Sequence, residues 1–262
     1  MSLRINQNID ALNSYRNLSV TQGQLSKSLE KLSSGFRINR AADDAAGLAI
    51  SEGLRSQVGG LKVGVRNAQD GISVVQTAEG ALTEVHSMLQ RMNDLAVQYA
   101  NGTNNTDSKA ALSGEFTQLQ SEISRITTNT NFNGVSLFAA GTLSFQVGST
   151  AADKIDVTTA AAPATIASAV ITDGGVSVQT AIKDVSTARA TFGALQNRFE
   201  HTINSTNVAI ENLSASESRI RDTDMASEMV NFTRANILSQ AGTAMLAQAN
   251  SAPQGVLQLL RG

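Results

Sequence analysis

Apolar residues recur every seven positions between residues 178 and 220, which predicts a long helix with one buried face. The seam positions are Val178, Val185, Phe192, Phe199, Thr206, Leu213 and Ile220, with Ala181, Ala188, Leu195 and Ala209 three residues after four of them. No proline interrupts the pattern, so it predicts a helix of about 43 residues, roughly 64 Å long at ~1.5 Å per residue. Such a helix must bury its single apolar stripe against another long helix.

A second sevenfold pattern upstream provides the partner. Its members are Ala68, Val75, Leu82, Leu89 and Ala96, accompanied by Ala78, Val85, Met92 and Tyr99. We expect the two segments to pack as a long antiparallel coiled coil. The Gly59-Gly60 pair weakens the local case for one unbroken helix over residues 44–100, whereas the strong seam beyond residue 65 favours it.

A shorter helix and a hairpin lie between these two segments. After a turn at residues 101–107, the chain places Leu112, Phe116, Leu119, Ile123 and Ile126 on one helical face. Alternating apolar and polar residues at 143–147 and 155–157 predict a β-hairpin. Residues 160–175 are mainly Ala, Thr and Gly around Pro163, too poor in bulky apolar residues for a core element. We therefore expect a hairpin and an outermost tip at about residues 131–175.

Each end of the chain carries a single amphipathic helix. The candidate assembly positions are Ile5, Ile9, Leu12, Leu25, Leu29 and Leu32 near the start, and Met225, Met229, Phe232, Leu238, Met245, Leu257 and Leu260 near the end. Helices with such narrow stripes gain little alone, because most helical stability comes from packing the apolar face on a partner. We expect them to form a terminal coiled-coil domain of residues 1–44 and 222–262.

The predicted fold is therefore mainly α, with a central antiparallel coiled-coil bundle over residues 45–221. The chain has a formal net charge of −2 and therefore lacks the excess of basic residues that binds nucleic acid or an anionic membrane. We expect neither as a partner. The chain lacks cysteine, which excludes thiolate nucleophiles and cysteine metal sites. No apolar run approaches the ~18 residues of a membrane span, and the first residues lack the apolar segment of a secretory signal peptide.

Candidate catalytic groups are few. The paired carboxylates of Asp43 and Asp44 invite an enzymatic interpretation, but no partner base or nucleophile accompanies them, and acids are favourable at a helix start. His86 and His201 have no metal-ligand spacing, and we interpret them as helix-surface or packing residues. The sequence thus predicts no enzyme activity and no cofactor.

Five segments, in this order, resemble the bacterial flagellin family. They are SSGFRINRAADDAAGLAIS at residues 33–51, NAQDGISVVQTAEGAL at 67–82, LQRMNDLAVQYANGT at 89–103, NRFEHTINSTNVAIENL at 197–213 and QAGTAMLAQANSAPQGVLQLLR at 240–261. The resemblance covers both arms of the chain. Only the hairpin and the tip separate the arms, so the chain resembles a short flagellin without the outer variable domains.

The resemblance implies a structural subunit of the helical flagellar filament used for swimming motility, located outside the cell. Repeating one subunit head to tail along a non-closing operation gives an open filament, which agrees with apolar terminal helices as association surfaces. The resemblance also implies export through the flagellar type III apparatus without a cleaved signal peptide. The implied partners are other copies of the chain, a flagellar export chaperone that holds the C-terminal helix, and hook-associated and cap proteins.

The resemblance further implies recognition by the flagellin-sensing Toll-like receptor of animal hosts. The matching positions are Gln90, Arg91 and Leu95 in LQRMNDLAVQ, with Glu115 on the following helix. Without the family, Arg91 and Glu115 would be read as part of a solvated helix face.

Three other classes of protein can be weighed against the sequence, and of these the hook–filament junction protein stays open. A hook–filament junction protein would share the terminal helices and the filament lattice, although the match to QAGTAMLAQAN favours a flagellin. A zinc protease would need an H-E-x-x-H motif, which the chain lacks. A signalling or chaperone-like coiled coil would not require the apolar end at residues 257–260.

Overall fold

The computed structural model describes residues 7–159 and 169–261, with side-chain positions up to Ser251. The contacts divide the chain into two compact units, and each is described by itself. The terminal unit contains Met1–Arg55 and Leu213–Gly262, and the central unit contains Ser56–Asn212.

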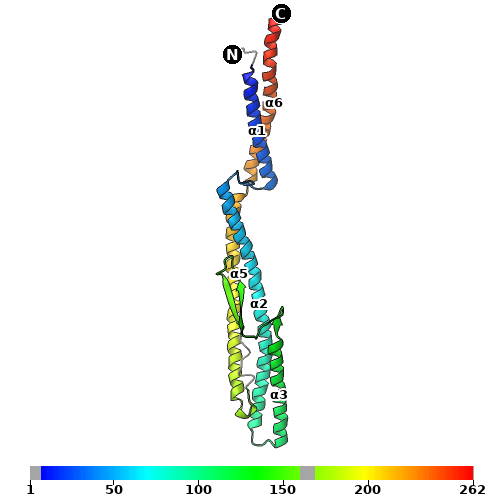
Figure 1. Ribbon diagram of the computed structural model, residues 1–262, viewed down its shortest axis with the longest axis vertical. Coiled ribbons are helices and arrows are strands. Elements are labelled where there is room, and N and C mark those ends of the chain that lie inside the picture. Colours follow the sequence, from blue (N-terminus) through cyan, green and yellow to red (C-terminus); the bar gives the residue numbers. More distant parts are fainter. Residues whose placement is uncertain (1–6, 160–168, 262) are drawn as a thin grey trace. The chain divides into compact units, whose positions relative to one another are not determined.

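The terminal unit is built on two helices that lie side by side, α1 (Ile9–Ser34) and α6 (Met225–Arg261) (Figure 1). They run antiparallel, because Asn8 bonds to Ala249 at one end and Phe36 forms a bridge with Asp222 at the other. Helix α1 begins at Ile9, directly after its N-cap Asn8, and residues 1–6 lie outside the described residues. Helix α6 continues past Pro253 to Arg261.

The central unit contains most of α2 (Ala45–Ala100), all of α3 (Thr106–Asn129) and most of α5 (Val176–Arg221). Its core is continuous along the three helices. The predicted seam residues within it are at most 3% exposed, namely Val75, Leu82, Leu89, Val185, Phe192 and Phe199. Leu213 is half-buried and falls in the terminal unit. The predicted fold class, a mainly helical bundle with a small hairpin region and a terminal helix pair, is confirmed.

Helix α2 is unbroken in spite of its glycines, and the predicted hairpin explains several of them. Strands β3 (Gly141–Gln146) and β4 (Lys154–Thr159) pair antiparallel with Phe145 opposite Ile155. The hairpin lies against one stripe of α2 formed by Gly60, Gly64 and Asn67. A Cβ atom at Gly64 would stand 2.4 Å from the carbonyl oxygen of Val147. The Asn67 amide donates to the Gln146 carbonyl over 2.8 Å. Glycine in this stripe lets the strand backbone touch the helix backbone.

A second, shorter hairpin joins β1 (Asn131–Phe132) to β2 (Val135–Ser136). Its two turn residues, Asn133 and Gly134, both have positive φ, at 50° and 81°. That is the geometry of a type I′ turn, for which Asn-Gly is the preferred pair. The sequence analysis did not identify this hairpin, although the Asn-Gly signal was present.

Part of the predicted tip belongs to the core. Residues 160–168, with Pro163, lie outside the described residues. Beyond them, Ala169 and Ile171 are buried in the central core, and Ile171 opens a short 3-10 helix, η1 (Ile171–Asp173). The expectation that this end of the segment is an outermost tip is therefore wrong, because two apolar side chains suffice to anchor it.

The boundary between the units differs from the expected one. The sequence analysis drew it at the connectors, near residues 44 and 222, whereas contacts divide the chain after Arg55 and after Asn212. Helices α2 and α5 both continue through these positions, so the ends of the two helices contribute to the terminal unit.

Candidate assembly and receptor surfaces

The seam between α1 and α6 alternates large and small residues. Along α1 a heptad pattern of half-buried or buried positions contains Ala11, Ser14, Leu18, Thr21, Leu25, Ser28 and Leu32. Along α6 the corresponding pattern contains Glu228, Phe232, Ala235, Ser239, Gly242, Leu246 and Ala249. Glu30, Lys31 and Asn236 are also half-buried and lie outside this pattern. On these two helices, only Ser28 and Ala235 are fully buried among the side chains described. The helix pair therefore has a regular seam but very little core.

Small residues bring the two helices close together. A Cβ atom at Gly242 would lie 3.2 Å from Cδ1 of Leu18. At the open end of the pair, the Asn8 side chain accepts from the Ala11 backbone N–H over 3.0 Å and caps α1. Its amide nitrogen also donates to the Ala249 carbonyl over 2.7 Å, which ties the start of α1 to α6.

Most of the predicted assembly residues are exposed. Leu25, Leu32 and Phe232 point into the seam and are half-buried. The exposed ones are Ile9, Leu12, Leu29, Met225, Met229, Leu238 and Met245, each about half or more accessible to solvent. Ile5 lies outside the described residues, and Leu257 and Leu260 lie in α6 beyond the described side chains. Tyr15, Val20, Val230 and Ile237, which the sequence analysis did not select, are also exposed.

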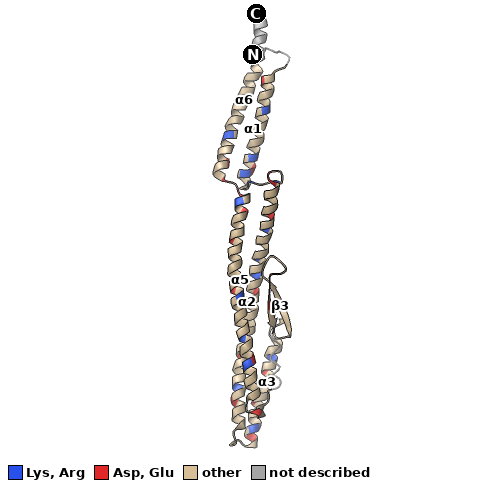
Figure 2. Ribbon diagram, turned by 90° about the vertical axis from the view of Figure 1, so that its left-hand side faces the viewer, with Lys and Arg blue, Asp and Glu red and all other residues tan. Residues whose placement is uncertain are grey.

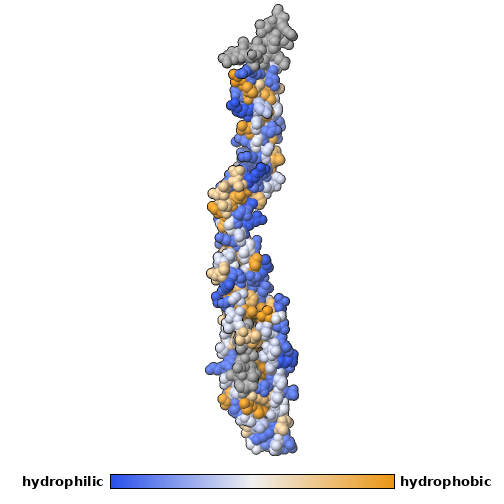
Figure 3. Space-filling model, in the orientation of Figure 1, coloured by the Kyte–Doolittle hydropathy of each residue, from blue (hydrophilic) through white to orange (hydrophobic). Residues whose placement is uncertain are grey.

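These side chains give the terminal unit an apolar outer surface. Figure 3 shows hydrophobic residues interspersed with polar ones on the face of this unit turned toward the viewer. On α6, a groove of about 550 Å³ is lined mainly by Met229, Val230, Ile237 and Leu238. Burying a bulky apolar side chain completely contributes about 1.5–3 kcal/mol relative to leaving it exposed. Exposed apolar surface of this kind is typical of a protein–protein contact.

A second groove, of about 360 Å³, is polar and runs between α1 and α6. Its charged lining residues are Lys27, Lys31, Glu228 and Arg234. Figure 2 shows basic residues on both helices of this unit. The two grooves share Arg234 and Leu238, but most lining residues of the first are apolar and most of those of the second are polar or charged.

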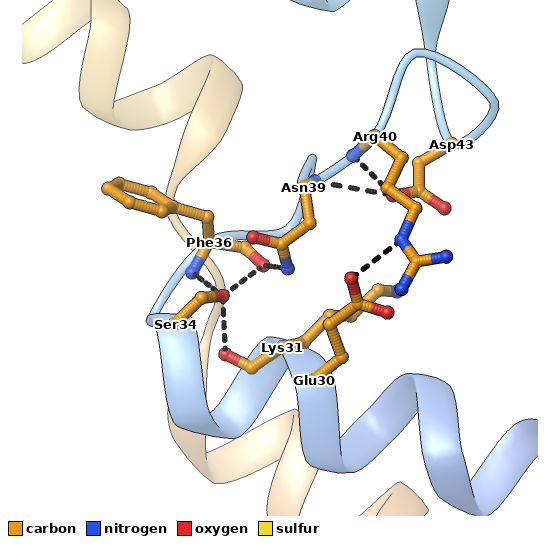
Figure 4. Close-up of polar contacts among 7 residues, drawn as sticks. All are labelled: Glu30, Lys31, Ser34, Phe36, Asn39, Arg40 and Asp43. Atoms are coloured by element: carbon orange, nitrogen blue, oxygen red, sulfur yellow. Dashed lines mark hydrogen bonds and ion pairs between the residues drawn. The ribbon is translucent and has the colours of Figure 1, made fainter.

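The connector after α1 is held by local polar contacts (Figure 4). Gly35 ends α1 in the left-handed conformation, with φ of 76°. Arg40 is paired with Glu30 over 2.8 Å. The Asp43 carboxylate accepts from the backbone N–H groups of Arg40 and Asn39, and the bond from Arg40 is the main reason why the pKa of Asp43 lies below its usual value. Asp43 therefore stabilises the connector by accepting these two backbone hydrogen bonds.

The neighbouring acid also serves the helix start. Asp44 accepts from the Gly47 backbone N–H over 2.8 Å, which is the N-cap interaction of α2. Helix α2 begins at Ala45, so both acids precede its first turn instead of standing within it. Among the described residues there is no cluster of three or more His, Cys, Asp or Glu side chains able to hold a metal ion. None of the described helices is both long and apolar enough to span a bilayer.

The connector between α5 and α6 is hydrogen-bonded to the connector between α1 and α2. The Arg37 backbone N–H donates to the Arg221 carbonyl over 2.7 Å, and the Thr223 N–H donates to the Gly35 carbonyl over 3.0 Å. The Arg221 guanidinium lies 5.0 Å from the centre of the Phe36 ring and pairs with Glu52 over 2.5 Å. The same group of contacts thus holds both connectors of the terminal unit in place.

The predicted receptor residues lie on α2 and α3 of the central unit. Arg91 Nε donates to Glu115 Oε1 over 2.7 Å, and both side chains are about half exposed. This hydrogen bond is the main cause of the raised pKa of Arg91. Gln90 is also exposed and bonds to the His86 ring. Leu95, in contrast, is completely buried in the core, so it supports the surface from below.

Comparison with protein families gives two matches. The model of the bacterial flagellin N-terminal helical region matches residues 5–142, and that of the bacterial flagellin C-terminal helical region matches residues 176–260. Together they account for most of the chain, apart from residues 143–175, which contain most of the β3–β4 hairpin and the segment before α5.

Individual relatives agree over nearly the full length. A flagellin of Halalkalibacterium halodurans is 53% identical over 271 residues, which cover 98% of this chain and 99% of the relative. A flagellin of Bacillus subtilis is 45% identical over 307 residues, covering 99% and 100%. The crystal structure of Bacillus cereus flagellin has a TM-score of 0.51 and 31% identity, and covers 54% of this chain and 88% of that one.

Proposed function

Because the chain belongs to the bacterial flagellin family, and is a structural subunit that polymerises with itself into the extracellular flagellar filament, we propose that α1 and α6 are the elements that join its copies. The family is structural and not enzymatic. The identity with flagellins over both arms favours a filament subunit over the hook–filament junction protein considered above.

One observation carries this proposal: α1 and α6 expose many of their bulky apolar residues, whereas the seam between them alternates large residues with small ones. Leu12, Ile237 and Met245 are 62%, 61% and 63% exposed, whereas Ser28 and Ala235 are buried. A helix pair that served only to stabilise a single chain would place its leucines and methionines in the seam. The arrangement suits helices whose main apolar contacts are with other copies.

The energetics make ordering and assembly one coupled event. Ordering the backbone costs about 1–2 kcal/mol per residue, and a two-helix pair in which only Ser28 and Ala235 are fully buried among the described side chains recovers little of that cost. We therefore expect α1 and α6 to be marginal in the free chain and firmly ordered once neighbouring copies cover their outer surface.

Limited proteolysis of free chain and filament tests this proposal. We expect protease to trim the free chain to a resistant core of roughly residues 45–220, while filaments remain largely intact. Deleting residues 225–262 should abolish polymerisation and leave the core folded. A free chain whose ends resist protease as well as its core does, or a deleted chain that still forms filaments, would overturn the proposal.

Family membership also supports partners and a route for the chain. The partners are an export chaperone that holds α6, together with hook-associated and cap proteins. The route is the flagellar type III apparatus, without a cleaved signal peptide. Chaperone binding to the full chain, and its loss when residues 225–262 are deleted, is the expected result of a pull-down with purified components.

A second candidate function is recognition by the flagellin-sensing Toll-like receptor. The observation that favours it is the exposed Arg91–Glu115 pair beside Gln90, in which α2 presents a guanidinium and an amide and α3 presents a carboxylate. Arginine is enriched among the residues that dominate protein interfaces. A cell-based assay of receptor activation with free chain is the test, and silence at saturating concentration ends this candidate.

A further inference from the structure

The methionines of this chain divide between its two units by exposure. In the central unit, Met92 is completely buried and Met88 is packed half-buried against the core. In the terminal unit, Met225, Met229 and Met245 are 49%, 52% and 63% exposed, and all three lie on α6. Met1 lies outside the described residues.

The composition makes these thioethers the natural targets of a peroxide. The chain contains no cysteine and no tryptophan, so no thiol or indole competes for a mild oxidant. The susceptibility of a sulfur atom follows its exposure to solvent. Among the described methionines, the three on α6 therefore react before the two in the central core.

We propose that Met225, Met229 and Met245 form an oxidation site through which peroxide controls polymerisation of this chain. The inference rests on the proposed role of α6 in joining the copies. It adds that the contact surface can be chemically switched before assembly.

The reaction is a two-electron oxygen transfer. A lone pair of the methionine sulfur attacks one oxygen of hydrogen peroxide, a new S–O bond forms, and the O–O bond breaks. The departing hydroxide takes up the remaining proton and leaves as water. The sulfur is oxidised to the sulfoxide and the peroxide is reduced, so one peroxide is consumed per methionine.

The sulfoxide changes the surface in a way that opposes contact. Met229 lines the apolar groove on α6 together with Val230 and Ile237, and Met225 precedes it by four residues, one helical turn. A thioether there packs as an apolar, adaptable side chain. A sulfoxide carries a polar oxygen that water solvates in the free chain. An apolar interface would strip that water away without supplying a donor.

Oxidation of these methionines should be faster before assembly than after it. Before assembly, all three sulfur atoms are accessible to solvent. In a filament that buries the outer face of α6, peroxide reaches them much more slowly. Oxidation therefore acts on chains that have not yet been incorporated, and filaments already formed resist it.

Peroxide treatment of the full-length free chain, followed by peptide mass mapping and measurement of the critical concentration for polymerisation, tests the inference. We expect oxygen to add at Met225, Met229 and Met245 before Met88 and Met92, and the critical concentration to rise at least ~10-fold. For the variant M225L/M229L/M245L, whatever its own starting value, the critical concentration should be the same before and after treatment. The matched control M88L/M92L, a volume-conserving exchange, should stay sensitive.

Reversal on the natural sequence provides an independent measurement. Treating oxidised chain with a pair of methionine sulfoxide reductases, one for each epimer, should restore the original critical concentration. Unchanged polymerisation of chains fully oxidised at these three residues overturns the inference and leaves the proposed function intact. Untreated chain that does not polymerise at all overturns the proposed function instead, and this inference with it.

Discussion

Gly71 of α2 lies directly against the ring of Phe199 of α5. A Cβ atom at Gly71 would stand 2.7 Å from Cζ of that ring, closer than a methyl group and an aromatic carbon can approach. The ring cannot retreat, because Phe199 is completely buried and meets Phe145 of the hairpin edge to face, with centroids 5.7 Å apart. Gly71 is therefore needed for packing, in the middle of a helix where glycine is otherwise unfavourable.

The first prediction concerns this contact. Gly71→Ala should lower the free energy of unfolding by about 1–2 kcal/mol, because overpacking costs ~1–3 kcal/mol and exceeds the helix-propensity gain of up to ~1 kcal/mol. The matched control is Gly80→Ala on the same helix, where nothing lies within 4 Å of the new Cβ atom. That variant should be more stable than the natural chain in urea unfolding. Equal behaviour of the two variants would mean that the Phe199 ring moves freely.

The second prediction concerns the seam of the central unit. Phe192 is 3% exposed, so Phe192→Ala should destabilise this unit by about 3–5 kcal/mol. Val208→Ala, at an exposed position of the same helix, should cost little. Thermal unfolding followed by circular dichroism distinguishes them. A melting temperature unchanged by Phe192→Ala would contradict a filled core at this position.

The third prediction concerns the outer surface of α6. Ile237 is 61% exposed in a single chain, so Ile237→Lys should leave the free chain as stable as before. Placing an ammonium group in a subunit contact should nevertheless raise the critical concentration at least ~10-fold, because a buried charge needs a partner. Ile237→Leu keeps an apolar side chain and should polymerise normally. Light scattering measures all three chains, and normal polymerisation of the lysine variant would exclude Ile237 from the contact.

The fourth prediction concerns the start of α5. Asp173 accepts from the backbone N–H groups of Gly175 and Ser177, and its pKa lies below its usual value, chiefly because of the Ser177 hydroxyl. A carboxylate with a lowered pKa stabilises the fold above its unfolded pKa of about 3.9, and this stabilisation is lost as the pH falls through the folded value. Asp173→Ala should thus cost about 1 kcal/mol at pH 7 and progressively less below pH ~4.

Thr172→Ala, at an exposed position of the same turn, is the control for this pH dependence. Urea unfolding at several pH values gives the comparison. A difference between Asp173→Ala and the natural chain that stays constant down to strongly acidic pH would show that the carboxylate charge is not involved.

The fifth prediction concerns the candidate receptor surface. Arg91→Ala should weaken receptor binding by the free chain at least ~30-fold, as truncation of an arginine in the centre of an interface does. Arg125→Ala is a suitable control, because Arg125 of α3 is likewise an exposed arginine paired with a glutamate, Glu122. Surface plasmon resonance with the receptor ectodomain measures both. Equal losses for the two variants would point to general electrostatics rather than a specific contact.

The long-range pattern of the fold could be predicted from the sequence because a heptad is a local signal with one physical cause. The seam of α5, the pairing partner in α2 and the hairpin of β3 and β4 all follow from the spacing of apolar residues. The flagellin resemblance, carried by residues in both arms, is confirmed by the family matches.

For the terminal helices, the spacing of apolar residues does not predict which side chains lie in the seam. A search for apolar residues selects Leu12 and Leu29, which are exposed, and passes over Ser14, Thr21 and Ser28, which face the partner helix. The apolar pattern cannot identify small polar seam positions, and it selects instead exposed residues for which we propose contacts with other copies. The same limit applies to the glycines of α2, since Gly64 reads as a weak point until the strand that touches it is known.

The hairpin that packs on these glycines has a mechanical consequence for α2. Glycine lowers the bending stiffness of an isolated helix, and α2 concentrates it at Gly59, Gly60 and Gly64. The hairpin residues that follow β3 cover Gly60 and Gly64, and the Asn67 amide holds the end of β3 against the same face of α2. Gly59 and Gly80 have no such neighbour, so we expect α2 to bend more readily at these two glycines than at the two that the hairpin covers.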